Sequence, residues 1–369
     1  MNKYILALVV VIALLINSNS VFGQNILKSG FDPDEYKMVL EINSHHFDTI
    51  LGKYTLPEPS AKLIFRSKEV GFDNRWDYWK TDSNIGVISL RGTAPTKTSW
   101  LENFYAAMIP ATGSVITSDS TVFAYKLAKD SNAYIHVGWL VGLSFIADDI
   151  NELIHSEYDK GVTNFIIVGH SQGGVMSMML RSYLEYVDDN LGRRILIKTY
   201  ASAPPKPGNL YYAYDFEEIT QGGWAYRIVN TADWVPQMPF SVQRFDDLNE
   251  VNPFSNYKKL IKNSPWYERM YINGKMNKMD KRSTKTQETY TELLGEKSFA
   301  YVQKVLPDAK NPSPMASFDY KVCGNAIILR PTETYNTNYV DKAKKEGIFV
   351  HHHFYAYWLL VKMHFPDRG

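Results

Sequence analysis

The chain has almost no cysteine and no excess of either charge. Cys323 is the single cysteine among 369 residues, so no disulfide can form within the chain and packing must stabilise the fold. Lys and Arg number 40 and Asp and Glu number 39, which leaves a formal net charge of +1. Because no global basic field would attract a polyanion, we expect no nucleic-acid partner.

Long apolar runs are equally scarce, and the one exception lies near the N-terminus. Lys3 precedes the unbroken apolar run Ile5 to Ile16, and Val21-Phe22-Gly23 follows a polar stretch. This pattern predicts a secretory signal peptide over residues 1–23. An uncleaved anchor is the alternative, but the run is short for a membrane span. We therefore expect an exported protein, periplasmic or extracellular, with no stable membrane span after signal cleavage.

Residues 24–369 predict a single catalytic domain in which strands and helices alternate. Such alternation predicts an α/β fold with a central, mostly parallel sheet flanked by helices. A helical insertion is expected at about residues 240–315, before the end of the chain. The sequence does not indicate the oligomeric state. Strands are predicted at Ile85 to Leu90, Phe165 to Val168, Ile195 to Tyr200 and Tyr226 to Val229, and a helix at Ile146 to Tyr158.

The most informative motif is Gly169-His170-Ser171-Gln172-Gly173-Gly174, between a short apolar run and a helical pattern. A serine hydroxyl is a poor nucleophile at neutral pH, so it must be presented at an exposed tip where a base can reach it. A sharp strand-to-helix turn flanked by glycines provides that tip. The motif therefore predicts a nucleophile elbow with Ser171 at its apex, and an ordinary glycine-rich loop is the alternative.

Five segments of the chain resemble the class 3 (fungal-type) lipase family of α/β-hydrolases, and they follow one another in the same order as in that family. The resemblance covers roughly Met38 to Pro239 and then Tyr320 to the C-terminus. Gln172 replaces a leucine of the family's elbow, and Leu90 replaces a phenylalanine of its oxyanion strand. The resemblance implies the α/β-hydrolase fold and hydrolysis of carboxylic esters. The segments are Ile88 to Thr93, Ile135 to Trp139, Gly169 to Gly174, Tyr200 to Asn209 and Tyr226 to Pro236.

Acyl transfer by a serine needs a base to take its proton and an acid to orient that base. In α/β-hydrolases these residues follow in the order Ser, Asp, His. The resemblance and its place after a strand point to Asp233 as the acid. Asp148 and Asp149 precede the elbow and are expected to be solvated, and Asp215 lacks the matching flanks.

The base must follow Asp233, where the chain has four histidines. His364 lies near the terminus before a proline, which leaves the run of His351, His352 and His353. In the family, an aromatic residue lies three or five positions after the catalytic histidine, and Tyr355 and Tyr357 have that spacing from His352. We expect His352 to be the base and keep His351 and His353 as alternatives.

Two backbone N–H groups are needed to stabilise the oxyanion of the reaction. Gln172, directly after the nucleophile, is expected to supply one, and by resemblance Thr93 supplies the other, with its hydroxyl as a third donor. The alternative for Thr93 is a plain turn at the end of a strand. His136 is expected to be a packed structural residue.

Two further segments bear on the substrate. Apolar residues at helical spacing between Ala94 and Pro110 predict either a mobile lid, as the resemblance implies, or a helix packed on the sheet. The stretch from Asn256 to Lys285 interleaves basic residues with Trp, Tyr and Met. It predicts either a surface that touches anionic lipid or polymer, or a solvated helical insert, and we prefer the insert.

Together these features predict an exported serine carboxylic-ester hydrolase, most simply a lipase, that forms an acyl-enzyme on Ser171. Its partner would be a lipid or another ester, met at a lipid–water interface if the lid exists. The rivals are a carbohydrate-ester or feruloyl-type esterase, a serine peptidase, and a catalytically silent hydrolase fold used for binding. No cofactor and no metal are expected, since the triad needs neither.

Overall fold

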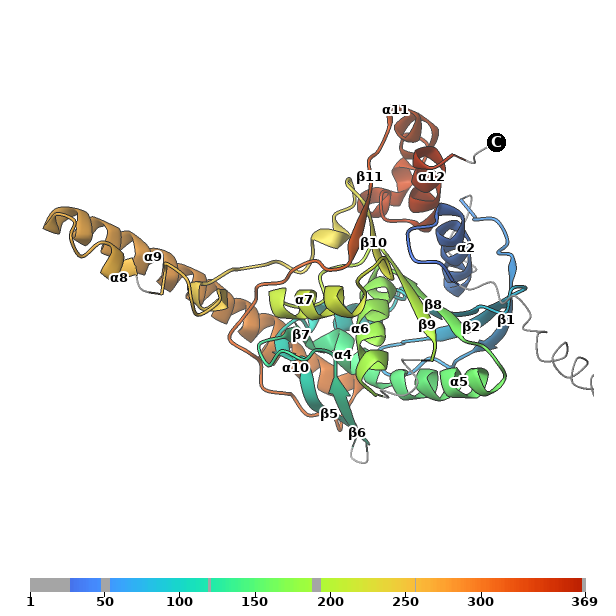
Figure 1. The fold of residues 1–369 in the computed structure, drawn as a ribbon, viewed down its shortest axis with the longest axis horizontal. Helices are drawn as coiled ribbons and strands as arrows, with labels where there is room; N and C mark the ends of the chain where they lie inside the picture. The colour runs from blue at the N-terminus through green and yellow to red at the C-terminus, as the bar shows by residue number, and fades with distance from the viewer. Residues whose placement is uncertain (1–26, 48–53, 119–120, 188–193, 256, 367–369) are drawn as a thin grey trace, which may run out of the picture.

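A seven-stranded sheet forms the centre of the computed structural model, in the order β1-β2-β3-β8-β9-β10-β11 (Figure 1). β3 and the four strands after it in this order are parallel, whereas β1 and β2 pair antiparallel. The structure describes residues 27–47, 54–118, 121–187, 194–255 and 257–366, so the predicted signal peptide lies outside it. The strands are β1 (Ala61–Arg66), β2 (Trp76–Thr81), β3 (Gly86–Leu90), β8 (Asn164–His170), β9 (Leu196–Ser202), β10 (Ala225–Asn230) and β11 (Asn325–Leu329).

Helices cover both faces of this sheet, and the sequence of β8 shows why. Successive side chains of a strand point to opposite faces. Phe165 and Ile167 therefore join one apolar core, while Ile166 and Val168 join the other. All seven residues of β8 are buried, as in a strand covered on both sides. The first core includes α4 (Val137–Ser144), α5 (Ala147–Asp159), α6 (Gln172–Val187) and α7 (Leu210–Ile219), and the second α2 (Pro33–Ser44) and α12 (Phe354–His364).

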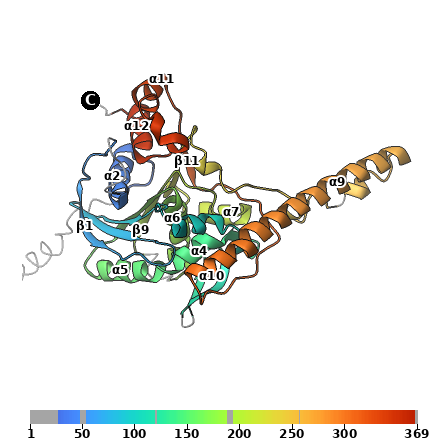
Figure 2. The ribbon, with the colours of Figure 1, turned by 180° about the vertical axis from the view of Figure 1, so that it is seen from behind.

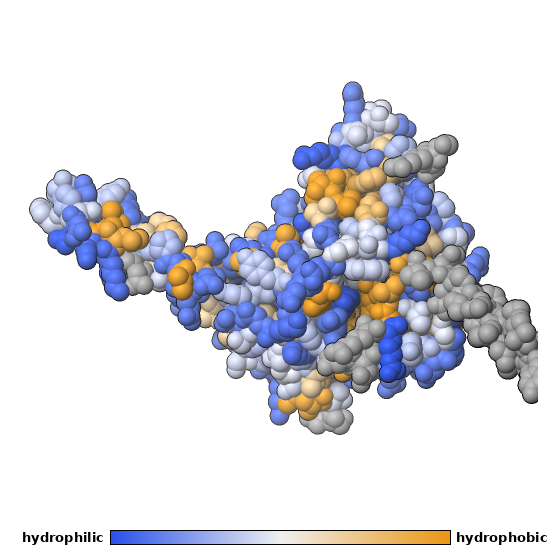
Figure 3. Space-filling view, viewed as in Figure 1, coloured by the Kyte–Doolittle hydropathy of each residue, from blue (hydrophilic) through white to orange (hydrophobic). Residues whose placement is uncertain are grey.

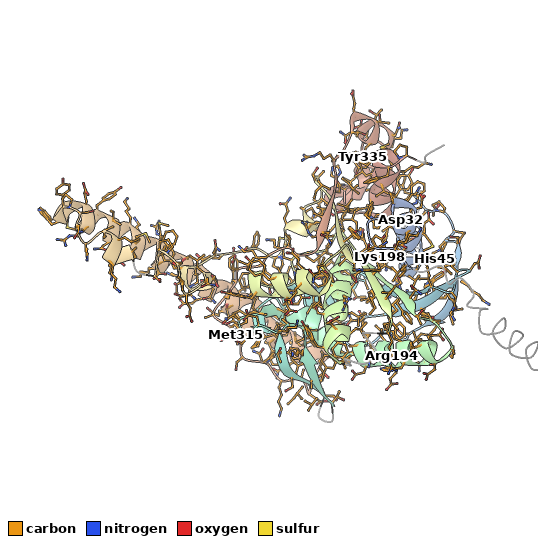
Figure 4. The ribbon with its side chains drawn as sticks, in the orientation of Figure 1. Asp32, His45, Arg194, Lys198, Met315 and Tyr335 are labelled. Atoms are coloured by element: carbon orange, nitrogen blue, oxygen red, sulfur yellow. The ribbon has the colours of Figure 1, made fainter. Side chains whose placement is uncertain are left out.

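The start of α2 is fixed to the sheet by polar contacts. The Asp32 side chain accepts from the backbone N–H groups of Asp34 and Glu35, which caps the helix. The carboxylate of Glu35 accepts from the buried Lys198 ammonium at 2.6 Å and from the Tyr200 hydroxyl at 2.6 Å, both on β9. Figure 4 shows Lys198 beside this end of the helix, near Asp32. This end of α2 is therefore tied to the middle of the sheet.

The predicted strands and the predicted helix before the elbow are confirmed, as β3, β8, β9, β10 and α5. The helix predicted within Ala94 to Pro110 was too long, because it ends at Phe104 as α3 (Lys97–Phe104). The next residues form a strand, β4 (Met108–Pro110), which pairs with β7 (Tyr134–His136). Pairing with a strand distant in the sequence overrides the helical spacing of the apolar residues.

The remaining elements are short or belong to the predicted insertion. The insertion contains one long helix, α9, that projects away from the body in Figures 1 and 2. No described helix is both long enough and apolar enough to cross a membrane. These elements are η1 (His45–Phe47), β5 (Thr112–Ser118), β6 (Thr121–Lys126), η2 (Val235–Gln237), η3 (Phe245–Asp247), α8 (Tyr257–Leu260), α9 (Trp266–Thr291), η4 (Glu292–Lys297), α10 (Ser298–Val305), α11 (Glu333–Tyr335), η5 (Asn336–Val340) and η6 (Lys344–Phe349).

Candidate active site

The carboxyl ends of three parallel strands bring the predicted site residues together. Thr93 follows β3, Ser171 follows β8 and Asp233 follows β10. Because parallel strands end at the same edge of a sheet, loops that are far apart in the sequence meet there. The chain beyond β11 returns to this edge and supplies His352.

Ser171 lies at the apex of a tight turn between β8 and α6. Its backbone has a φ of 60°, in the left-handed region that a serine rarely adopts. Its N–H donates to the carbonyl of Ser202 at 2.9 Å, and its own carbonyl accepts from the N–H of Gly174 at 2.9 Å. A Cβ on Gly169 would lie 2.0 Å from the carbonyl oxygen of Gly173. The flanking glycines therefore allow the turn to close.

The Asp233 carboxylate is buried and held by three donors. Oδ1 accepts from the Val235 N–H at 3.0 Å. Oδ2 accepts from His352 Nδ1 at 2.7 Å and from the Tyr357 hydroxyl at 2.8 Å. The Tyr357 oxygen also accepts from the Asn230 N–H at 3.1 Å. Tyr357 was noted in the sequence only for its spacing from His352, and its contact with the acid gives that spacing a structural reason.

The three adjacent histidines point to different surroundings. His352 has its ring on Asp233 and lines the cavity beside Ser171. His351 Nδ1 lies 3.1 Å from the Tyr335 hydroxyl, and burial lowers the pKa of His351. His353 lines the same cavity and occupies the position before the first residue of α12. Of the three, His352 is the one that the structure places in hydrogen-bond contact with the predicted acid.

His170, the residue before Ser171, contacts the segment that carries His352. Its Nε2 lies 2.6 Å from the backbone carbonyl of His352, and its Nδ1 lies 2.9 Å from the Ser202 hydroxyl, which is 2.7 Å from the Tyr36 hydroxyl. A carbonyl only accepts, so Nε2 must donate. Burial holds the pKa of His170 well below its usual range, so the ring is neutral and Nδ1 accepts from Ser202. No role beyond its place in the motif was predicted for His170.

The predicted oxyanion residues, Thr93 and Gln172, line the same cavity as Ser171. Among the described residues, no backbone carbonyl accepts from the N–H of either one. The Thr93 hydroxyl, however, donates to the Gln172 side-chain oxygen at 2.9 Å and accepts from Asn103 Nδ2 at 3.0 Å. In this arrangement its proton is already engaged, so the expected third donor is not directed at the cavity.

Glu102, on α3, is a buried carboxyl that sequence reasoning missed. Its Oε2 accepts from Gln172 Nε2 at 2.6 Å and from Asn74 Nδ2 at 2.9 Å. A Cβ on Gly142 would lie 2.0 Å from its Oε1, and one on Gly138 would lie 2.1 Å from its backbone oxygen. These two glycines, one turn apart on α4, make room for Glu102. Burial raises its pKa well above the usual range for a glutamate.

Helix α3 forms one wall of the cavity. Trp100 and Phe104 are exposed and line the cavity, whereas Glu102 is fully buried against α4 and the elbow helix. The buried contact holds α3 to the body. Among the apolar residues of Ala94 to Pro110, Tyr105, Met108 and Ile109 are buried in the body, whereas Trp100 and Phe104 are exposed at the cavity. The lid and the packed helix both stay predictions.

The cavity at Ser171 has a volume of about 420 Å³. Its wall is dominated by aromatic and aliphatic side chains, and polar groups are concentrated around the serine. A site of this kind binds an apolar group and fixes its orientation at a few polar positions. The apolar lining residues include Phe47, Trp100, Phe104, Trp139, Trp234, Val235, Met238, Phe240, Leu294, Phe349 and Phe354.

The other residues discussed in the sequence analysis do not contact Ser171, Asp233 or His352. His136 is buried, stacks on Trp139 with ring centroids 3.6 Å apart, and has its pKa lowered by burial to about 3. Asp148 accepts from a tyrosine on α6, and Asp215 accepts from the Lys129 N–H on another side of the molecule. Asp149 is exposed on α5.

His364 contacts the backbone of Arg330 near the end of α12. Among the described residues there is no cluster of three His, Cys, Asp or Glu side chains that could hold a metal ion.

Comparison with known proteins gives three kinds of match. Residues 87–243 match the family model described as lipase (class 3). Triacylglycerol lipase OBL1 of Arabidopsis thaliana is 25% identical over 187 residues, which are 44% of this chain and 36% of that protein. The chain thus matches little more than a third of that relative's length.

Two solved structures are similar to parts of this chain. Lipase II from Rhizopus niveus is 21% identical with a TM-score of 0.41, over 56% of this chain and 74% of that chain. A triacylglycerol lipase from Penicillium expansum is 20% identical with a TM-score of 0.40, over 56% and 72% of the two chains. The resemblance predicted from five short segments is confirmed by the family model: over residues 87–243 this chain is similar to the class 3 lipases, on an α/β-hydrolase-type sheet.

Proposed function

We propose that the protein hydrolyses carboxylic esters of lipids through an acyl-enzyme on Ser171. The observation that carries the proposal is the contact of His352 Nδ1 with Asp233 Oδ2 at 2.7 Å, beside a strained serine on the wall of the same apolar cavity. Asp233, His352 and Ser171 are the groups that acyl transfer requires, in the chain order of α/β-hydrolases.

In the first half of the proposed reaction, His352 Nε2 takes the proton of the Ser171 hydroxyl as its oxygen attacks the ester carbonyl. The Asp233 carboxylate accepts from Nδ1–H, which fixes the tautomer that leaves Nε2 free to act as the base. The N–H groups of Thr93 and Gln172 would donate to the oxyanion. When the tetrahedral intermediate collapses, His352 gives the proton to the leaving alcohol and the acyl group stays on Ser171.

In the second half, water replaces the alcohol. His352 removes a proton from the water, whose oxygen attacks the acyl carbon, and then returns that proton to the Ser171 oxygen as the carboxylic acid departs. The contact of His170 with the backbone carbonyl of His352 at 2.6 Å would keep the base in the same position through both halves of the reaction. Tyr357 would do the same for the acid.

The lining of the cavity supports a lipid acyl group as the bound part of the substrate. Trp100, Phe104, Met238 and Phe240 offer apolar contact beside Ser171. A sugar ring would need several hydrogen-bonding side chains in the wall, so the carbohydrate-ester alternative has less support. The silent-binder alternative has less support as well, because candidates for every catalytic role are present together.

The test is a chain-length series of nitrophenyl esters and triglycerides with wild type and Ser171→Ala. Loss of the nucleophile and loss of the base should each lower kcat by at least roughly a thousand-fold. His352→Ala is therefore paired with His351→Ala, the same change one residue earlier, which should retain most activity. Undiminished hydrolysis by Ser171→Ala would refute the mechanism. Activity confined to aryl-sugar esters would refute the lipid substrate.

Export is part of the same proposal. It rests on the charged, apolar and small-residue pattern of residues 1–23. The protein recovered outside the cytoplasm should begin near Gln24, which N-terminal sequencing would measure. A recovered chain that still begins at Met1 would contradict cleavage.

A further inference from the structure

The insertion before the last strand forms an arm, which we define as residues 248–255 and 257–291. The arm consists of α9 and of the preceding segment, which lies along one side of it. Contacts along its length include Tyr257 with Asn277, at 3.4 Å, and Arg269 with the carbonyl of Lys262, at 3.2 Å. With 26 residues, α9 is about 39 Å long. Figures 1 and 2 show it extending away from the sheet.

The arm is rooted only at its end nearest the body. Of the 26 residues of α9, all of them described, Gln287 alone is buried. Tyr290, one turn later, stacks on Phe318 with ring centroids 5.0 Å apart. The apolar side chains at the far end of α9 are not buried against the rest of the protein, so packing in a core does not explain why they are there.

The free end of the arm is both apolar and exposed. Trp266 is 68% exposed, Leu260 67%, and Met270 and Tyr271 65% each. Figure 3 shows an apolar patch near this end, surrounded by hydrophilic residues. Isolated exposed apolar residues are ordinary, but a cluster of large ones at the tip of a projecting element marks an interaction surface.

The arm also has a large excess of positive over negative charge. Between Tyr257 and Lys285 there are nine Lys and Arg and two acidic residues, a net charge of +7. Since the whole chain carries +1, the remainder carries −6. At about 100° per residue, five of the cations and the four apolar tip residues of α9 share one side of the helix. The cations are Lys275, Lys278, Lys281, Arg282 and Lys285, and the tip residues are Trp266, Tyr267, Met270 and Tyr271.

We infer that the arm docks the protein on a bilayer surface that carries anionic lipids. The cations would lie against lipid headgroups, while Trp266, Tyr267 and Met270 enter the interface. Trp and Tyr favour that depth because one part of the ring is apolar and another is polar. The exposed Leu260 and Met270 at the tip favour lipid over a single-stranded nucleic acid, because bases would stack on the aromatic rings but not on these aliphatic side chains.

The arm is continuous with the wall of the candidate active site. After α9, the η4 turn brings Leu294 into the cavity wall, and the carbonyl of Leu294 accepts from the N–H of Ala106 at 2.8 Å. A docked arm would therefore hold the cavity at a fixed place relative to the lipid surface. That the docked protein acts on lipid esters rests on the proposed function. That it binds the bilayer rests on the arm alone.

The experiment measures binding of Ser171→Ala protein to vesicles, since this parent cannot consume the lipid. One set of vesicles is phosphatidylcholine and the other contains about 30% phosphatidylglycerol, so that only the second attracts cations. Every variant has the same N-terminus, so the apolar run of residues 5–16 contributes equally to all. Circular dichroism confirms that each variant keeps its helices.

Two arm variants and one matched control are compared with the parent. Replacing Lys275, Lys278 and Lys281 by Gln should weaken binding to the anionic vesicles roughly 10- to 100-fold, as should Trp266→Ala with Tyr267→Ala and Met270→Ala. The control replaces Lys62, Lys68 and Lys304 by Gln, the same loss of charge on other exposed positions, and should bind as the parent does within about three-fold. Binding of the parent should also fall steeply at about 0.5 M salt.

The outcomes separate this inference from the proposed function. If wild type hydrolyses a soluble short-chain ester but the arm variants bind vesicles as tightly as the parent, docking by the arm is refuted while the proposed function stands. Vesicle binding that depends on the arm, without ester hydrolysis, would refute the proposed function alone. A third outcome is that the parent does not bind vesicles but forms a dimer in sedimentation experiments, and that the tip variant is a monomer. The surface at the tip would then bind a second copy of the chain, and the membrane inference would be wrong.

Discussion

Glu102 couples the wall of the cavity to Gln172, the residue after Ser171. Its carboxyl has two amide donors, from Gln172 and Asn74, and lies fully buried against glycines of α4. Gln172 in turn accepts from the Thr93 hydroxyl at 2.9 Å. The two predicted oxyanion residues are thus fixed relative to each other by side chains, which keeps their backbone N–H groups in place before a substrate arrives.

We predict that Glu102→Gln is more stable than wild type at neutral and higher pH. Burial raises the pKa of Glu102, so the folded protein holds this proton to a higher pH than the unfolded chain does. Stability in wild type is therefore complete below the ordinary pKa of a glutamate and falls as pH rises toward the raised value. The amide is neutral at every pH and can still accept from Gln172 and Asn74. Chemical unfolding of both proteins from pH 5 to 8 measures the difference.

Glu102→Ala provides the contrast. It leaves the amide donors of Gln172 and Asn74 without this acceptor, which should cost about 1–3 kcal/mol for each buried group. The ester activity should fall with it, because Gln172 loses its support. A Gln variant that is as destabilised as the Ala variant would contradict the assignment of a neutral carboxyl to Glu102.

At the scale of elements, the sequence predicted what local patterns encode. The run before Ser171 is continuously apolar because β8 is covered on both faces, and its neighbours in the parallel sheet have the same signature. The elbow was predictable because a nucleophile at a tight turn needs glycines at fixed positions around it. These patterns predicted the sheet and the elbow, whereas Asp233 and His352 were predicted from the resemblance and from the chain order of α/β-hydrolases.

The elements that the sequence did not predict depend on distant partners. Met108 pairs with His136 across 28 residues, and a strand of three residues has too little local pattern to compete with helical spacing. Glu102 lies in an amphipathic helix, where a glutamate is normally solvated. Glu102 is buried because α4 packs closely against it at Gly138 and Gly142. This contact exists only once the two helices have packed together, so no local pattern predicts it.

Gly274 gives a prediction for the arm as an element. A Cβ at this position in α9 meets no atom within 4 Å, so Gly274→Ala should stabilise the helix by about 0.5–1 kcal/mol without strain. Because α9 is rooted only in its last turns, the gain should stay local. Hydrogen exchange in the arm should slow roughly two- to five-fold, which is the rate equivalent of that energy, while the midpoint of global thermal unfolding stays unchanged.

The control for the arm is Gly142→Ala, the same substitution within the body. Its Cβ would lie 2.0 Å from Glu102 Oε1, so it should lower the global unfolding temperature. If Gly274→Ala instead shifts the global midpoint, the arm unfolds together with the body and is not the independent element described above.

At the scale of the whole molecule, buried neutral histidines make the fold sensitive to acid. Burial holds the pKa values of His46 and His170 well below the usual range and that of His136 at about 3. The unfolded chain binds these protons near pH 6.5, and the folded protein does not. Stability is therefore present above about pH 6.5 and lost as pH falls, by about 1.4 kcal/mol per pH unit for each histidine once the unfolded forms are protonated.

Glu102 acts in the opposite direction, since its folded form keeps a proton that the unfolded chain has released. Between about pH 6 and 5, these four groups together should therefore contribute a slope near two protons, about 2.8 kcal/mol per pH unit. Glu102→Gln should steepen that slope by about one proton and His136→Phe should reduce it by about one, whatever each does to absolute stability. Urea unfolding at closely spaced pH values measures both slopes. Equal slopes in the two variants would show that other groups govern the acid sensitivity, because a change in packing alone shifts stability by the same amount at every pH.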